Sequence, residues 1–138
     1  MSTNVDLVRS IFAAWERGDV SSVEWAHPEI EFAVPDSPEA RSSIGLSGMA
    51  EAMRDFLGAW AEWRVQADDY RELDSERVLV LQHYSARGKA SGLEVGQMWA
   101  KGANVFHVRR GKVIRLACYF DRERALADLG LAPETGSL

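Results

Sequence analysis

The sequence predicts an α+β domain in which helices close over the concave face of a strongly bent, mostly antiparallel sheet. Three observations predict this fold class. Apolar residues recur at helical spacing in the N-terminal half and again near the C-terminal end. Four strand-like stretches lie between them, separated only by short turns. Consecutive strands joined in this way must pair antiparallel, and helices grouped beside such a sheet enclose a pocket.

Two helices are predicted at the N-terminal end. Thr3 caps the first, and Gly18 is a suitable stop. Asp19 is the expected cap of a second, short helix, which should end at His27 because a residue before proline favours extended geometry. The apolar face of the first helix consists of Val8, Ile11, Phe12 and Trp15.

A strand with one buried face is predicted over residues 30–34, where apolar side chains alternate with Glu31 and Ala33. Residues 35–48 are rich in Ser, Gly and Pro and are expected to form a loop. Ser47 is the expected cap of the next helix. Its apolar stripe is Met49, Met53, Phe56, Leu57 and Trp60.

The second half of the chain predicts an antiparallel meander and a closing helix. Gly96 and Gly102 are expected places for a bend or bulge. Asp121 is the expected cap of the last helix, which should end at Gly130. The four predicted strands are 64–73, 77–87, 93–109 and 112–120.

Composition predicts one soluble globular domain over residues 1–138, with a core from about 3 to 131. Of the 138 residues, 46% are hydrophobic and 27% are charged, and the net charge is −5. An acidic balance argues against binding to nucleic acid or to an anionic membrane. The single Cys118, the lack of a signal-peptide pattern and the lack of a long apolar run predict a cytoplasmic protein.

Several local motifs, in this order and spacing, resemble the SnoaL-like branch of the NTF2-like superfamily, from about residue 3 to 131. The resemblance implies a cone-shaped barrel with a central apolar pocket, usually in a homodimer. It implies little about the reaction, since the fold hosts isomerases, cyclases, epoxide hydrolases and non-catalytic binding proteins. The motifs are Trp15-Glu16-Arg17-Gly18-Asp19, His27-Pro28-Glu29-Ile30-Glu31, Gly48-Met49, Ser91-Gly92, Gly111-Lys112-Val113, Tyr119-Phe120-Asp121, Ala125-Leu126 and Gly130-Leu131.

The chain departs from the catalytic patterns of that superfamily. Cys118 stands where the cyclases and epoxide hydrolases have an acidic residue, and Gln82 and Tyr84 stand where the hydrolases have an Arg-x-Asp pair. The ketosteroid isomerases have a tyrosine in the first helix, where this chain has Ile11 or Phe12. Their carboxylate base matches the region 34–36, and their carboxylic acid matches Asn104.

The candidate catalytic residues are therefore Asp36 as a general base and Tyr84 or Asn104 as a hydrogen-bond donor to the substrate. An Asx turn in Pro35-Asp36-Ser37-Pro38 is the structural explanation of Asp36 and the one that its local sequence favours. By strand alternation, the predicted pocket combines apolar walls with neutral polar groups. Its expected residues are Phe12, Trp15, Met53, Trp60, Val80, Gln82, Tyr84, Asn104, Phe106, Leu116, Cys118 and Phe120.

His83 and His107 are expected to point away from this pocket, although a slip of one residue in register would turn them inward. The three histidines match no metal-binding spacing, so neither a metal nor another cofactor is expected. Cys118 is expected to be a small core residue. The outer sheet face, with Ala103, Val105 and His107, is the expected homodimer interface.

Three functions remain open from the sequence. The first is an isomerase, cyclase or hydrolase that acts on a hydrophobic carbonyl or ring substrate by acid–base chemistry. The second is a non-catalytic module that binds a small hydrophobic molecule in the same pocket. In the third, aromatic side chains such as Tyr84 and Phe120 fill the cavity, and the dimer surface carries the function.

Overall fold

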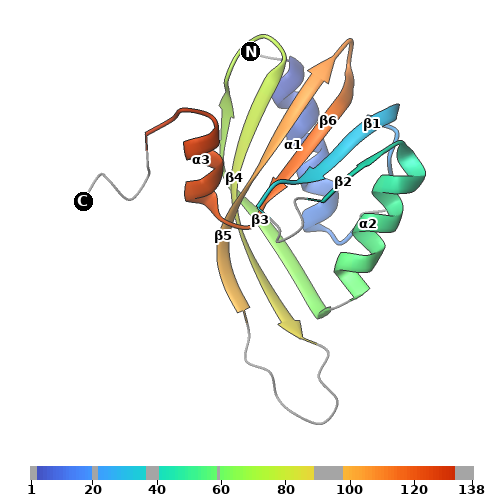
Figure 1. Ribbon diagram of the computed structural model, residues 1–138, viewed down its shortest axis with the longest axis vertical. Helices are drawn as coiled ribbons and strands as arrows, with labels where there is room; N and C mark the ends of the chain where they lie inside the picture. The colour runs from blue at the N-terminus through green and yellow to red at the C-terminus, as the bar shows by residue number, and fades with distance from the viewer. Residues whose placement is uncertain (1–2, 20–21, 37–40, 59, 89–97, 133–138) are drawn as a thin grey trace.

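The structure, a computed structural model, describes residues 3–19, 22–36, 41–58, 60–88 and 98–132. These residues form helices on both sides of one sheet (Figure 1). The helices are α1 (Thr3–Glu16), α2 (Leu46–Gly58) and α3 (Arg122–Asp128). The strands are β1 (Ala26–Val34), β2 (Arg41–Ile44), β3 (Trp60–Glu72), β4 (Arg77–Gly88), β5 (Met98–Arg109) and β6 (Lys112–Tyr119).

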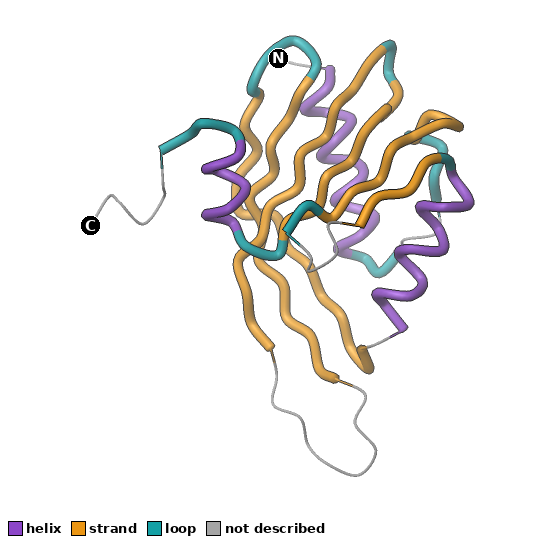
Figure 2. Tube along the Cα trace, viewed as in Figure 1, coloured by secondary structure: helices purple, strands orange, loops and turns teal. Residues whose placement is uncertain are grey.

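The sheet has six strands in the order β2-β1-β6-β5-β4-β3. The strands from β3 to β6 pair antiparallel with their neighbours in sequence, which confirms the predicted meander. β1 is parallel to β6, and β2 pairs antiparallel with the outer edge of β1. Figure 2 shows the resulting bent sheet, in which β3, β4 and β5 extend together beyond the other strands. The predicted α+β fold class is confirmed.

The two faces of the sheet have separate cores. We call the face that α1 and α2 cover the inner face. Val78, Val80 and Tyr84 point to it, whereas Leu79 and Leu81 point to the outer face, as strand alternation requires. α3 packs on the outer face, where Ala125 and Leu126 are buried. The sequence prediction that all helices pack on the concave face is therefore wrong for α3.

Several local predictions differ from the structure, among them the expected cap Ser47, since α2 already begins at Leu46. Residues 22–25 are not helical, and β1 already begins at Ala26, because Ala26 pairs with Val113 of β6 and the Val113 N–H donates to the oxygen of Trp25. The predicted loop contains β2, which pairs with β1. Trp60 begins β3 and does not end the preceding helix, since it pairs with Gly88 of β4. In the other cases a distant strand determines the local conformation.

Irregular positions bend the sheet. Asp68 forms a bulge in β3, because its neighbours Ala67 and Asp69 pair with consecutive residues of β4. The Ala67 N–H donates to Oε2 of Glu16 on α1, at 3.0 Å. Gly102 lies in regular register, contrary to the expected bulge, but a Cβ there would lie only 2.6 Å from the main-chain oxygen of Tyr119. The expected bend at Gly96 lies outside the described residues.

The predicted turns and cap are confirmed. Arg110 and Gly111 both have positive φ, at 52° and 77°, which suits a two-residue hairpin between β5 and β6. Asp121 caps α3 and accepts a hydrogen bond from the Glu123 N–H. Gly130 follows the helix with φ at 71°.

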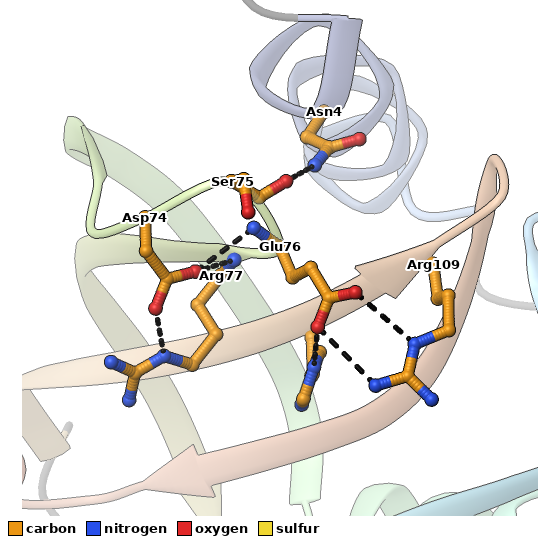
Figure 3. A network of polar contacts seen from close by, with 7 residues as sticks. Asn4, Asp74, Ser75, Glu76, Arg77 and Arg109 are labelled. Carbon is orange, nitrogen blue, oxygen red and sulfur yellow. Dashed lines mark hydrogen bonds and ion pairs between the residues drawn. The ribbon is translucent and has the colours of Figure 1, made fainter.

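A polar network fixes the turn between β3 and β4 (Figure 3). The Asp74 carboxylate accepts from the Glu76 and Arg77 N–H groups and from Nε of Arg77. Glu76 binds Arg109 and His107 of β5. Asn4 of α1 donates to the Ser75 oxygen at 2.9 Å, so the turn connects β5 with the start of α1.

Candidate functional site

An aromatic cluster lies between α1 and one end of the inner face. Phe12 contacts Phe106 with ring centroids 6.1 Å apart, and Trp15 contacts the same ring at 5.9 Å. Tyr70 of β3 contacts Phe12, and Trp25 contacts Trp15. α1 supplies Phe12 and Trp15 from one side because they are three residues apart on the helix. The cluster makes this part of the inner face strongly apolar.

A group of polar side chains follows on the same face, toward the end of β4. Asn104 of β5 lies between Val80 of β4 and Cys118 of β6 in register. Its Nδ2 donates a 3.0 Å hydrogen bond to Oε1 of Gln82. Gln82 and Asn104 are only 6% and 4% exposed, so both amides lie inside the protein. Among the described residues, Oδ1 of Asn104 has no hydrogen-bond partner.

Tyr84 and Cys118 adjoin these amides, and both are neutral at physiological pH. Burial raises the pKa of Tyr84 to about 12, and the negative charge of Asp36 contributes. The same two causes, burial first, raise the pKa of the Cys118 thiol to about 12. Tyr84 can therefore act as a neutral hydrogen-bond donor, and Cys118 is unsuited to be a thiolate nucleophile at this pH.

Asp36 joins this region from the end of β1. Its carboxylate accepts hydrogen bonds from the N–H groups of Phe120, at 3.2 Å, and Asp121, at 2.8 Å. The Phe120 ring contacts the ring of Tyr84, with centroids 6.2 Å apart. Asp36 thus connects the end of β1 to the junction of β6 and α3. The charge of Asp36 reaches Tyr84 and Cys118, and Cys118 is the register partner of Asn104.

The other expected pocket residues differ in exposure. Trp15 and Met53 are partly buried against the same core, and Phe120 is 36% exposed. The side chain of Trp60 lies outside the described residues. That these residues together line a ligand cavity stays a prediction. Four of them are fully buried on the inner face, namely Phe12, Val80, Phe106 and Leu116.

The outer face carries an ion-pair cluster that the sequence reasoning missed. Arg122 is only 5% exposed, and its guanidinium donates to Oδ2 of Asp68 at 2.7 Å. His83 contacts the other oxygen of Asp68 at 2.6 Å. Burial alone would raise the pKa of Asp68, but the hydrogen bonds from Arg122 and His83 hold it below its usual value. One signal was in the sequence, since Arg122 precedes the buried Ala125 and Leu126 at helical spacing.

Both histidines of the meander face away from the inner side, as expected. His83 belongs to the outer cluster, and His107 binds Glu76 at 3.0 Å. Within the described part of the chain, no group of three or more His, Cys, Asp or Glu residues is placed to bind a metal ion. No helix in that part is long and apolar enough to cross a membrane.

A separate surface groove lies between α1 and the hairpin of β5 and β6. Its volume is about 490 Å³. Arg17, Asp19, Glu24 and Lys112 line it, together with apolar residues of α1, and Lys112 donates to the main-chain oxygen of Glu24. Charged walls distinguish this groove from the inner face.

A family model of the SnoaL-like domain matches residues 8–116, and the chain belongs to this family. None of the curated proteins matches the chain.

Solved structures of the NTF2-like fold are similar over nearly the whole chain. An NTF2-like protein of unknown function from Burkholderia pseudomallei is 20% identical, with a TM-score of 0.76, over 92% of this chain and 97% of that chain. TerC, co-crystallised with polyporic acid, is 18% identical, with a TM-score of 0.72, over 94% and 98%. A candidate polyketide cyclase from Xanthomonas campestris pv. campestris is 19% identical, with a TM-score of 0.67, over 90% and 94%. At these identities the likeness shows the fold.

Proposed function

We propose that the protein binds a small hydrophobic organic molecule at its inner face. The observation that carries this proposal is the buried pair Gln82–Asn104 beside an aromatic cluster. Buried polar groups cost free energy unless hydrogen bonds satisfy them. A buried amide oxygen without a hydrogen-bond partner among the described residues, such as Oδ1 of Asn104, is therefore unusual in a core that serves packing alone. Binding sites for organic ligands combine apolar walls with a few polar groups in this way.

The comparisons support an organic ligand. TerC was co-crystallised with polyporic acid, and the Xanthomonas campestris neighbour is a candidate polyketide cyclase. In this chain the site offers the neutral groups of Gln82, Tyr84 and Asn104, so we expect a ligand that is uncharged where it meets them. A buried charge without a partner would be strongly disfavoured there.

Titration with Nile red, an uncharged apolar dye, tests the proposal. We expect saturable binding that weakens in Phe120→Ala, because Phe120 contacts Tyr84 and is partly exposed. Ile44→Ala is the matched control, since Ile44 is 70% exposed on the edge strand β2. Two results would contradict a site at the inner face. One is binding that does not saturate, and the other is binding that is weaker in Ile44→Ala but unchanged in Phe120→Ala.

The second candidate function is catalysis of the isomerase, cyclase or hydrolase type by acid–base chemistry. The observation that favours it is the position of Asp36, whose charge acts on both Tyr84 and Cys118. A screen of hydrophobic carbonyl and epoxide compounds for turnover is the first step. Asp36→Asn should then reduce turnover strongly, whereas Asp121→Asn, the exposed helix cap next to it, should not. Equal turnover in wild type and Asp36→Asn would exclude Asp36 as the base.

We also propose a homodimer and a cytoplasmic location. The residues expected at the dimer interface need one correction, since Ala103 and Val105 are buried beneath α3 and cannot contact a partner. His107 and the charged side chains around it remain on the outer face. Sedimentation velocity measures the oligomeric state, and a monomer at all concentrations would exclude both the dimer and an association function that depends on it.

A further inference from the structure

We propose that the ligand of the inner face carries a hydroxyl or N–H group that donates a hydrogen bond to Oδ1 of Asn104. This inference rests on the proposed function and specifies the ligand further, as a hydrophobic ring compound bearing a hydrogen-bond donor. The sequence suggested the opposite polarity, with the Asn104 amide as a donor to a substrate oxygen. In the structure one N–H of the Asn104 amide already donates to Gln82, and the group of this amide without a partner among the described residues is Oδ1.

The evidence is that the nitrogen of the Asn104 amide makes a hydrogen bond, whereas its oxygen makes none among the described residues. Nδ2 of Asn104 lies 3.0 Å from Oε1 of Gln82, which fixes the direction in which the amide points. Oδ1 is buried and has no partner among the described residues. A buried acceptor without a partner costs free energy, and a ligand group that donates to this oxygen removes that cost.

Among the described residues, the register neighbours of Asn104 supply no donor to Oδ1. Val80, its neighbour on β4, is apolar, and Cys118, its neighbour on β6, carries a thiol, which is a weak donor. Gln82 presents its oxygen, not its nitrogen, to Asn104. Its Nε2 lies instead on the side of Gly102, where an added Cβ would be 3.4 Å from Nε2 and 3.3 Å from the Tyr84 ring. A donor for Oδ1 therefore has to come from outside this group.

Contacts on the outer face of the sheet fix the backbone of the Gln82–Asn104 pair. Arg122 donates to the main-chain oxygens of Gln82, at 2.6 Å, and Gly102, at 3.3 Å, from the outer face. Gln82 and Gly102 pair with one another across β4 and β5. These bonds fix the backbone that carries Gln82 and so favour one orientation of the pair. A preorganised acceptor of this kind discriminates between ligands better than a mobile one.

The test compares two probes of the same ring system, 2-naphthol and 2-methoxynaphthalene, which differ in the donor. Isothermal titration of wild type should give a dissociation constant about tenfold lower for 2-naphthol, the difference expected for one hydrogen bond of about 1.4 kcal/mol. Asn104→Leu should remove the preference, because leucine has a similar shape without the acceptor. Its melting temperature is measured alongside, because Oε1 of Gln82 loses its Asn104 donor in this variant.

Ile44→Ala is the control, because Ile44 is 70% exposed on the edge strand β2 and lies outside the expected pocket. It should retain the preference for 2-naphthol. Equal affinity of the two probes for wild type, or a preference that survives in Asn104→Leu, would overturn the inference. If Asn104→Leu does not fold, the comparison of the two probes on wild type and Ile44→Ala decides.

Nile red binding distinguishes a failure of the hydrogen-bond assignment from a failure of the proposed function. Saturable Nile red binding at the inner face with equal affinity for both naphthalene probes overturns the hydrogen-bond assignment and leaves the proposed function in place. If Nile red and both probes fail to bind wild type, the proposed function falls, and the inference falls with it.

Discussion

Nη2 of Arg122 lies 2.6 Å from the main-chain oxygen of Gln82, on the side of the sheet opposite to the Gln82 side chain. Arg122 belongs to α3 on the outer face, whereas the Gln82 amide belongs to the inner face and binds Asn104. One strand therefore connects α3 to the candidate site. The position of this short helix bears directly on the orientation of the polar groups that we expect to meet a ligand.

Arg122→Met should lower the free energy of unfolding by about 2 kcal/mol, because the Gln82 and Gly102 oxygens lose this donor and the Asp68 carboxylate keeps, among the described residues, only its contact with His83. We expect less than the full cost of breaking a buried ion pair, since the Asp68 side chain is 34% exposed. Urea denaturation measures the change. Arg124→Met on the same helix is the control, with an expected loss below about 0.5 kcal/mol for its exposed pair with Asp128. Equal losses in the two variants would mean that the Arg122 contacts are unimportant.

Gly102→Ala should destabilise the protein by about 1–3 kcal/mol, the usual range for an overpacked site. The added Cβ would lie 2.6 Å from the Tyr119 oxygen, which is main chain and cannot move away without disturbing the strand. Gly48→Ala on α2 provides the comparison, because its Cβ would meet only the Ser43 side chain, at 3.0 Å. Thermal unfolding of both variants measures the difference, and a larger loss for Gly48→Ala would contradict the close approach at Gly102.

Glu76 should make stability depend on acid pH. Hydrogen bonds from Arg109 and His107 lower the pKa of Glu76 from 4.5 to about 2. A carboxylate with a lowered pKa in the folded state stabilises fully above its unfolded pKa, and the contribution is lost as the pH falls toward the folded value. From neutral pH down to about pH 3, wild type should therefore lose more stability than Glu76→Gln.

The control for this pH effect is Glu51→Gln, at an exposed position of α2. It removes the same charge and should follow the wild-type pH dependence in urea denaturation. If the stability of Glu76→Gln and Glu51→Gln depends on pH in the same way, the contacts of Glu76 do not contribute to the acid sensitivity.

Cys118 should react slowly with Ellman's reagent in the native protein. A pKa of about 12 in place of 9.0 lowers the thiolate fraction near pH 8 about a thousandfold, and the greater nucleophilicity of the thiolate recovers about thirtyfold. We therefore expect native protein to react at least about thirtyfold more slowly than protein unfolded in guanidinium chloride. Because the chain has one cysteine, the signal comes from this thiol alone. Equal rates would mean that the native fold does not shield this partly buried thiol.

Some patterns that depend on near neighbours in the chain were predicted correctly from the sequence. Alternation along β4 placed Val80 and Tyr84 on one face and His83 on the other, because successive residues of a strand point to opposite sides. The cap at Asp121 and the turn at Arg110 and Gly111 were also predictable, since both depend on local backbone geometry.

What the sequence by itself determined was therefore the fold class, the meander and the face of each residue along it. Only the tertiary structure decided which distant segments meet. Asp36 binds the N–H of Phe120 across 84 positions of sequence, β1 pairs parallel with β6, and α3 lies on the outer face, with Arg122 on Gln82. Hydrophobic periodicity indicates which side of a strand is buried, but not which partner buries it. The polarity of the Asn104 amide depends on such a contact, and so does our proposal for its ligand.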